Sequence, residues 1–95
     1  MKLVLAIVQS GDADQIVGGL LVAGIRVTRL SSAGGFFRRS NVTLLIGVES
    51  PKVEAVLGII RANIRPRNEG RPPDEEVFPY GATIFVLQIE RFVYL

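Results

Sequence analysis

Apart from Lys2 at its start, the segment 2–8 is a continuously apolar run that is rich in branched side chains. Such a run is typical of a β-strand that is buried on both of its faces. Residues 81–89, near the other end of the chain, form a second such strand, with Ile84 and Val86 on one face and Phe85, Leu87 and Ile89 on the other. Because the side chains of a strand point alternately to the two faces of a sheet, each of these strands presents apolar groups on both faces. A sheet that contains them therefore needs cover on two sides.

Between these strands, two segments show the helical spacing of apolar residues. In the first, the apolar positions are Ile16, Val17, Leu20 and Leu21. We expect Asp12 or Asp14 to cap this helix, because a carboxylate accepts hydrogen bonds from the free N–H groups of the first turn. Gly24 is placed to end the helix. The pair Gly18-Gly19 costs about 1 kcal/mol per glycine, and we expect these small residues to let the helix lie close to a sheet.

The second helix is expected to begin at Ser50 and Pro51, which are typical of the N-cap and the first helical position. Its apolar stripe consists of Val53, Val56, Leu57 and Ile60. Residues at this spacing share one face of a helix. Residues 25–30 and 41–48 show alternating patterns, which predict two further strands.

The predicted order is strand, helix, strand, strand, helix, strand. This is the order of the ferredoxin-like βαββαβ fold of the α+β class, a four-stranded antiparallel sheet with two helices on one face. We expect residues 1–95 to form a single domain, because the chain is too short for two. Two helices leave the second apolar face open, and soluble proteins usually avoid such a patch. We therefore expect oligomers that pack through this face, since the tail at 91–95 is too short to cover a sheet.

The chain contains no cysteine and no histidine. The lack of cysteine excludes a disulfide framework, a thiol nucleophile and a thiolate metal site. The lack of histidine removes the usual general base and the commonest metal ligand, so an enzyme is not expected. The net charge is +2, and nine of the eleven basic residues are arginine, which suits phosphate contacts. The charges are too balanced for a typical DNA-binding surface.

No segment has the length of a membrane span. The longest nearly apolar stretch, residues 16–25, is half a span and contains glycines. The apolar start of the chain, residues 1–8, is too short for a secretory signal with its cleavage site. We therefore expect a cytoplasmic protein that binds neither a membrane nor DNA or RNA.

The segment 31–40 carries the residue types that a nucleotide site needs. Gly34-Gly35 lets the backbone turn sharply and point consecutive N–H groups at an anion. The rings of Phe36 and Phe37 offer stacking surfaces to flat bases, and two arginines follow them. The same pattern also fits a hairpin turn whose phenylalanines plug a subunit interface. Neither the Walker nor the Rossmann glycine motif occurs in the chain.

Polar residues on the two middle strands form a second candidate site. If side chains alternate regularly along both strands, Arg26 and Thr28 share one face of the sheet with Asn41 and Gly47. Polar groups on an apolar face mark either a solvent-exposed edge or the floor of a polar site, and the pattern leaves both open. The loop at 63–79 balances arginines against carboxylates, which indicates a solvated loop with weak ion pairs. No metal ion or other cofactor is expected.

Several segments of the chain resemble the PII-like cyclic di-AMP receptor proteins. They are residues 1–9, 26–30 (Arg-Val-Thr-Arg-Leu), 34–38 (Gly-Gly-Phe-Phe-Arg), 41–43, 46–48 and 81–87. The resemblance covers nearly the whole chain apart from the 63–79 loop. Its most specific part is the Gly-Gly-Phe loop that is followed by an asparagine.

The resemblance implies a homotrimer of ferredoxin-like subunits that binds cyclic di-AMP in clefts between neighbours and signals through its loops to an unknown downstream protein. By position, the pocket would contain Arg26, Thr28, Gly35, Phe36, Phe37, Asn41, Gly47 and Phe85. The family implies that Phe36 packs against adenine and that Arg26 and Thr28 make polar contacts. Phe37 stands where the family usually has leucine, and Gly24 where it commonly has asparagine. The loop before the last strand is also shorter here.

Three alternatives remain open at this point. The ligand of a PII-like sensor can also be ATP, ADP or another small metabolite, as in the wider PII group. A structural trimer that has lost ligand binding is the second alternative. An enzyme is the third, and it lacks the base that histidine or cysteine chemistry would supply.

Overall fold

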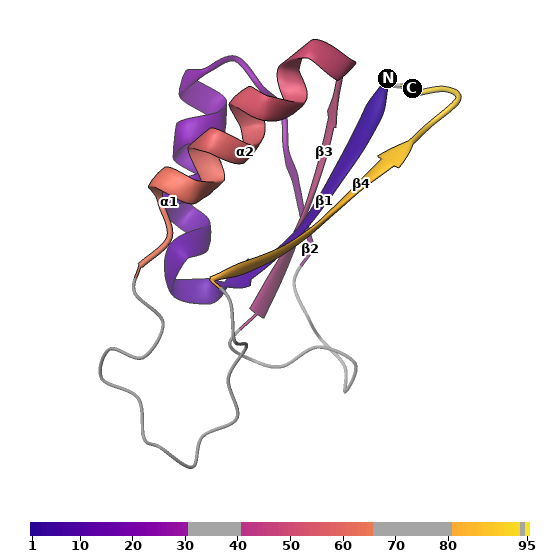
Figure 1. Ribbon diagram of the computed structural model, residues 1–95. Coiled ribbons are helices and arrows are strands. Elements are labelled where there is room, and N and C mark those ends of the chain that lie inside the picture. Colours follow the sequence, from indigo (N-terminus) through magenta and orange to yellow (C-terminus); the bar gives the residue numbers. More distant parts are fainter. Residues whose placement is uncertain (31–40, 66–80, 94) are drawn as a thin grey trace.

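The computed structural model of the protein has the predicted order of elements and describes residues 1–30, 41–65, 81–93 and 95 (Figure 1). The elements are β1 (Lys2–Gln9), α1 (Ser10–Val22), β2 (Thr28–Leu30), β3 (Asn41–Val48), the 3-10 turn η1 (Ser50–Lys52), α2 (Val53–Ala62) and β4 (Ala82–Gln88). The four strands form one antiparallel sheet in the order β2-β3-β1-β4. The ferredoxin-like α+β fold is thereby confirmed.

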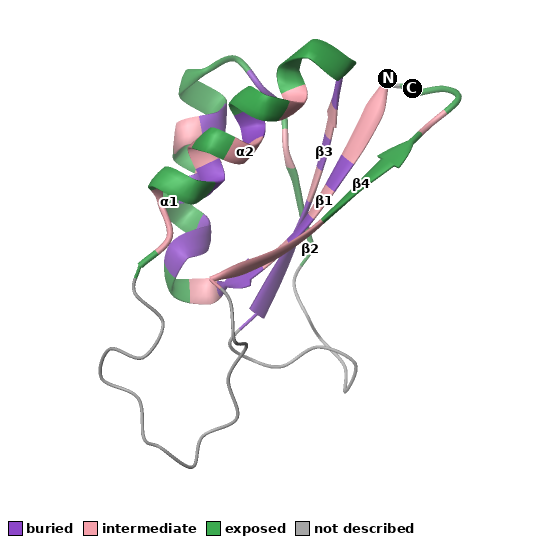
Figure 2. Cartoon of the chain, viewed as in Figure 1, coloured by how far each residue is buried: buried purple, intermediate pink, exposed green. Residues whose placement is uncertain are grey.

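Both helices lie on the same side of the sheet, and the core fills the space between them and the strands (Figures 1 and 2). The even-numbered positions of β1, β3 and β4 face this core. Its fully buried side chains include Val4, Ala6, Val8, Leu44, Ile46, Ile16, Leu20, Val56 and Ile60. Apolar burial of this kind is the dominant favourable term in folding. Within the described residues, neither helix is long and apolar enough to cross a membrane.

The start of α1 differs from the sequence-based expectation. The N-cap residue is Gln9, and no side chain caps the helix. Because the helix begins at Ser10, Asp12 lies inside its first turn and is buried, where its Oδ1 accepts a hydrogen bond from Nε of Arg65 at 2.8 Å. Asp14 is exposed and accepts a hydrogen bond from Nη1 of Arg29 at 2.6 Å. The prediction that one of these aspartates caps the helix is wrong, since both pair with arginines instead.

The end of α1 confirms the role predicted for Gly24. This residue has φ +78°, a left-handed conformation that side chains rarely adopt. Its N–H donates to the carbonyl of Leu21, and the next N–H, of Ile25, donates to that of Leu20. These two bonds define a Schellman motif, which satisfies carbonyls at the end of the helix.

Two further boundaries differ from their predictions. β2 spans Thr28–Leu30 rather than 25–30, because Ile25 is buried in the core before the chain joins the sheet. Ser50 is not an N-cap but the first residue of η1, whose own cap is Glu49. Pro51 does lie in the first turn, as expected, and α2 follows that turn directly.

The two adjacent glycines of α1 have different surroundings. A Cβ atom on Gly19 would lie 2.9 Å from Cγ2 of Ile59, so this glycine brings α1 close to α2. Gly18 faces open space, and nothing lies within 4 Å of its Cβ position. The expectation that the glycines adapt the helix to the sheet is therefore wrong, because the close neighbour is the other helix.

This difference predicts opposite effects of one substitution at neighbouring positions. Gly18→Ala should raise the free energy of unfolding by about 0.5–1 kcal/mol, because it removes the conformational entropy cost of a helical glycine. Gly19→Ala should lower it by about 1 kcal/mol, because overpacking against Ile59 outweighs that gain. Urea unfolding of both variants measures the two values. An equal rise in both would contradict the close packing of α1 on α2.

Candidate functional site

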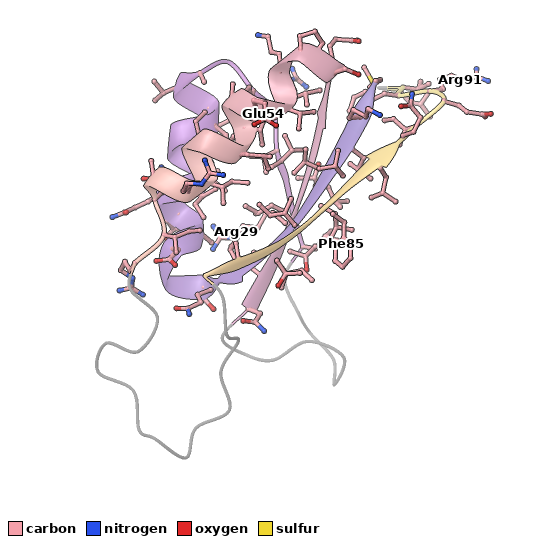
Figure 3. All side chains as sticks on the ribbon, in the orientation of Figure 1. Arg29, Glu54, Phe85 and Arg91 are labelled. Carbon is pink, nitrogen blue, oxygen red and sulfur yellow. The ribbon has the colours of Figure 1, made fainter. Side chains whose placement is uncertain are left out.

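The face of the sheet opposite the helices, here called the open face, is largely apolar, half-buried along β1 and exposed at the two edge strands. The register places one row of cross-strand neighbours on it, which runs from Thr28 through Leu45 and Leu5 to Phe85. Leu30, Phe85 and Leu87 are 42%, 53% and 45% exposed. Figure 3 shows Phe85 on the side of the sheet away from the helices, whereas Arg29 lies on their side. The prediction of a second, uncovered apolar face is confirmed.

One end of the open face carries three buried polar residues, here called the polar corner: Gln9, Asn41 and Thr43. Gln9 and Asn41 are direct cross-strand partners, and Thr43 lies two positions along β3 on the same face. Their exposed fractions are only 6%, 6% and 5%. In the part of the chain that the structure describes, Nε2 of Gln9 and Oγ1 of Thr43 have no hydrogen-bond partner. The most buried part of this face is thus its most polar part.

Sequence reasoning identified Asn41 as a site residue but missed Gln9 and Thr43. A signal for Gln9 was present in the sequence. Gln9 follows an apolar strand, and alternation of side chains places it on the same face as Leu3, Leu5 and Ile7. Its burial was not predictable, since glutamine at a strand end is usually exposed.

The structure brings four of the predicted site residues, Thr28, Asn41, Gly47 and Phe85, onto one face. Thr28 pairs with Leu45, which lies between Thr43 and Gly47 on the open face, so the predicted shared face is confirmed for Thr28, Asn41 and Gly47. Thr28 is exposed on the edge strand β2, and Arg26 is exposed two residues before it. Gly35, Phe36 and Phe37 lie outside the described residues.

Phe85 lies on the same face but is well separated from Thr28. Phe85 lies on β4 and Thr28 on β2, the two edge strands of the sheet. Three strand spacings separate them in the row of cross-strand neighbours. Neighbouring strands are about 4.8 Å apart, so the two residues are separated by about 14 Å. Leu45 and Leu5 lie between them on the open face.

Gly47 has a packing partner that the sequence did not reveal. The ring of Phe92, from the segment after β4, lies over it, and a Cβ on Gly47 would be 2.9 Å from Cε2 of that ring. The tail therefore reaches across part of the open face, although Phe85 and Leu87 remain exposed. The expectation that the tail is too short to cover the whole sheet agrees with this arrangement.

The described residues contain no group of three or more aspartate, glutamate, histidine or cysteine side chains that could hold a metal ion. The polar groups of the open face are amides and hydroxyls, which donate and accept hydrogen bonds but carry no charge. Arg26, two residues before Thr28, is a cation on the β2 side of the sheet. Such a set suits an organic ligand with hydrogen-bonding edges and an anionic part.

The sheet order and the two helices on one face define a ferredoxin-like α+β protein. The family model for the cyclic-di-AMP receptor matches residues 1–73. The chain therefore belongs to the cyclic-di-AMP receptor family, which is PII-like. It is also similar to a crystal structure of a functionally unknown protein from Pediococcus pentosaceus ATCC 25745. The sequences are 38% identical, the match covers 99% of this chain and 96% of the other, and the TM-score is 0.76.

The contact between Gly47 and Phe92 predicts an energetic coupling. Gly47→Ala should lower the free energy of unfolding by about 1 kcal/mol, because the new methyl group displaces the ring. In a Phe92→Ala background the same substitution should cost almost nothing. A double-mutant cycle measured by urea unfolding gives the coupling energy.

The matched control background is Val93→Ala, since Val93 is exposed and adjacent to Phe92. There the cost of Gly47→Ala should persist in full. An equal cost in all three backgrounds would show that the tail does not pack on Gly47.

Proposed function

We propose that the protein is a cytoplasmic PII-like signal-transduction protein that binds cyclic di-AMP in clefts between the subunits of a homotrimer. Membership in the cyclic-di-AMP receptor family supports this ligand. Binding would shift the protein toward the loop arrangement that binds the nucleotide more tightly. The size of the shift is set by the difference in nucleotide affinity between the arrangements. The changed loops would then alter contact with a downstream protein.

The observation that carries the shared cleft is the position of Thr28 and Phe85 at opposite edges of one face. A ligand that reached both within one chain would lie across Leu45 and Leu5, which offer nothing to a charged phosphate. Burying a charge against apolar groups without partners is costly. Packing the β2 edge of one subunit near the β4 edge of its neighbour would instead put both residues beside one ligand.

The exposed apolar surface supports assembly through the same face. Leu30, Phe85 and Leu87 are each more than two-fifths exposed, and Leu3 and Leu5 between the edges are half-buried. A second subunit packed on them would remove this area from water at about 25 cal/mol per Å². The face would therefore serve both assembly and ligand binding.

In this proposal one subunit supplies most of the pocket. Its residues would be Arg26, Thr28, Gly35, Phe36, Phe37, Asn41 and Gly47, with Phe85 from the neighbour. Phe36 would pack against an adenine ring, and stacking on an aromatic ring is worth about 1–3 kcal/mol per base. The guanidinium of Arg26 suits the phosphates. Binding at Gly47 would require the ring of Phe92 to share or leave its position.

A subunit-mixing experiment tests the shared cleft. Arg26→Ala removes the β2 side of each site, and Phe85→Ala removes the β4 side, so each variant alone should lose binding of cyclic di-AMP. When the two variants are refolded together, some neighbouring pairs join two intact sides. We expect the mixture to regain part of the binding capacity in isothermal titration calorimetry.

Light scattering must first show that both variants keep the mass of the unmodified assembly. A pool of each variant refolded alone is the control. If the mixture binds no more than these pools, the site lies within one chain and the shared cleft is wrong. Parallel titrations with ATP and ADP distinguish cyclic di-AMP from another adenine nucleotide.

A further inference from the structure

The burial pattern of the open face is the reverse of what a free surface shows. Its apolar side chains Phe85 and Leu87 are exposed, whereas Gln9, Asn41 and Thr43 of the polar corner are more than nine-tenths buried. Buried polar side chains nearly always have hydrogen-bond partners. Nε2 of Gln9 and Oγ1 of Thr43 have none among the described residues. Two buried groups with unused hydrogen bonds thus lie diagonally across β1 and β3, with Asn41 directly opposite Gln9.

The position of the corner connects it with the proposed site. Asn41, a predicted site residue, is the direct cross-strand partner of Gln9. Thr43 pairs on its other side with Leu30, two residues after Thr28 on the edge strand. The corner therefore adjoins the β2 side of the proposed cleft. Because its residues lie on paired strands rather than on a loop, their backbone positions are set by the sheet. Nε2 of Gln9 and Oγ1 of Thr43 are fully buried, so a ligand reaches them only after the groups that cover them move aside.

The chemistry of the unused groups favours one kind of partner. A primary amide presents a donor beside an acceptor, and the N6/N7 edge of adenine presents the complementary donor and acceptor. The matching edge of guanine presents two acceptors, N7 and O6, so an amide satisfies only one of them. A hydroxyl such as that of Thr43 donates or accepts as its neighbour requires. The pair suits adenine better than guanine.

We infer that Gln9 and Thr43 are additional ligand contacts, which recognise the hydrogen-bonding edge of an adenine base beside Asn41. This inference rests on the proposed function, because it assigns these two residues to the same nucleotide site. The ligand would satisfy Nε2 of Gln9 and Oγ1 of Thr43, which have no hydrogen-bond partner among the described residues. Selectivity for adenine over guanine then arises in part from the strands of the sheet.

The test uses two substitutions that keep side-chain size and remove hydrogen bonds, Gln9→Leu and Thr43→Val. Each should weaken binding of cyclic di-AMP by about tenfold or more, because a ligand group loses its buried partner. Gln9→Leu should also reduce the preference for cyclic di-AMP over cyclic di-GMP. Without ligand, Thr43→Val should keep or raise the melting temperature, since an unpaired buried hydroxyl is replaced by a methyl group. Calorimetric titration and thermal unfolding give these values.

Gln15→Leu is the matched control, because Gln15 is exposed on α1 and the chemical change is the same. It should bind cyclic di-AMP like the unmodified protein. If the unmodified protein binds and both corner variants bind equally well, the corner is not part of the site and only this inference fails. If the unmodified protein itself does not bind, the proposed function fails and takes the inference with it. A ligand-free Thr43→Val protein with a lower melting temperature or a changed mass would show that Thr43 serves the fold or a subunit contact instead.

Discussion

The organisation of this molecule depends on a mismatch: the sheet has two apolar faces, and both helices of the described residues lie on one of them. α1 and α2 cover the even-numbered side of the strands and build the core with it (Figure 2). The other side keeps Phe85 and Leu87 in contact with solvent. Burial of apolar area is the main driving force of both folding and association. The same constraint therefore sets the fold of one chain and the surface through which chains would join.

Within that open face, polar groups are confined to particular positions rather than scattered. Thr28 lies on the β2 edge, Thr83 lies on the β4 edge, and Gln9, Asn41 and Thr43 occupy one end of the face. Leu45 and Leu5 lie between Thr28 and Phe85. Such a division suits a surface that joins another subunit through its apolar middle and holds a polar ligand at its rim. The ring of Phe92 over Gly47 adds the tail to the parts of the chain that meet there.

The strands and their faces were predictable because alternation of side chains is a local property. It identified β3 at its observed bounds, β1 and β4 within one residue at each end, and the face that Thr28 shares with Asn41. Properties that depend on contacts between distant segments were not predictable. Asp12 resembles a helix cap in the sequence, but Arg65, far along the chain, pairs with it in the first turn. Gly19 and Gln9 likewise owe their roles to the neighbouring helix and to burial, neither of which a single segment reveals.

The measurement that tests the account most directly is native mass spectrometry of the protein with and without cyclic di-AMP. The account predicts a particle of three chains that takes up the nucleotide, and no nucleotide on a single chain. ATP and ADP, added in parallel, show whether another adenine nucleotide takes its place. A single 10.4 kDa chain that binds cyclic di-AMP by itself would contradict a site shared between subunits.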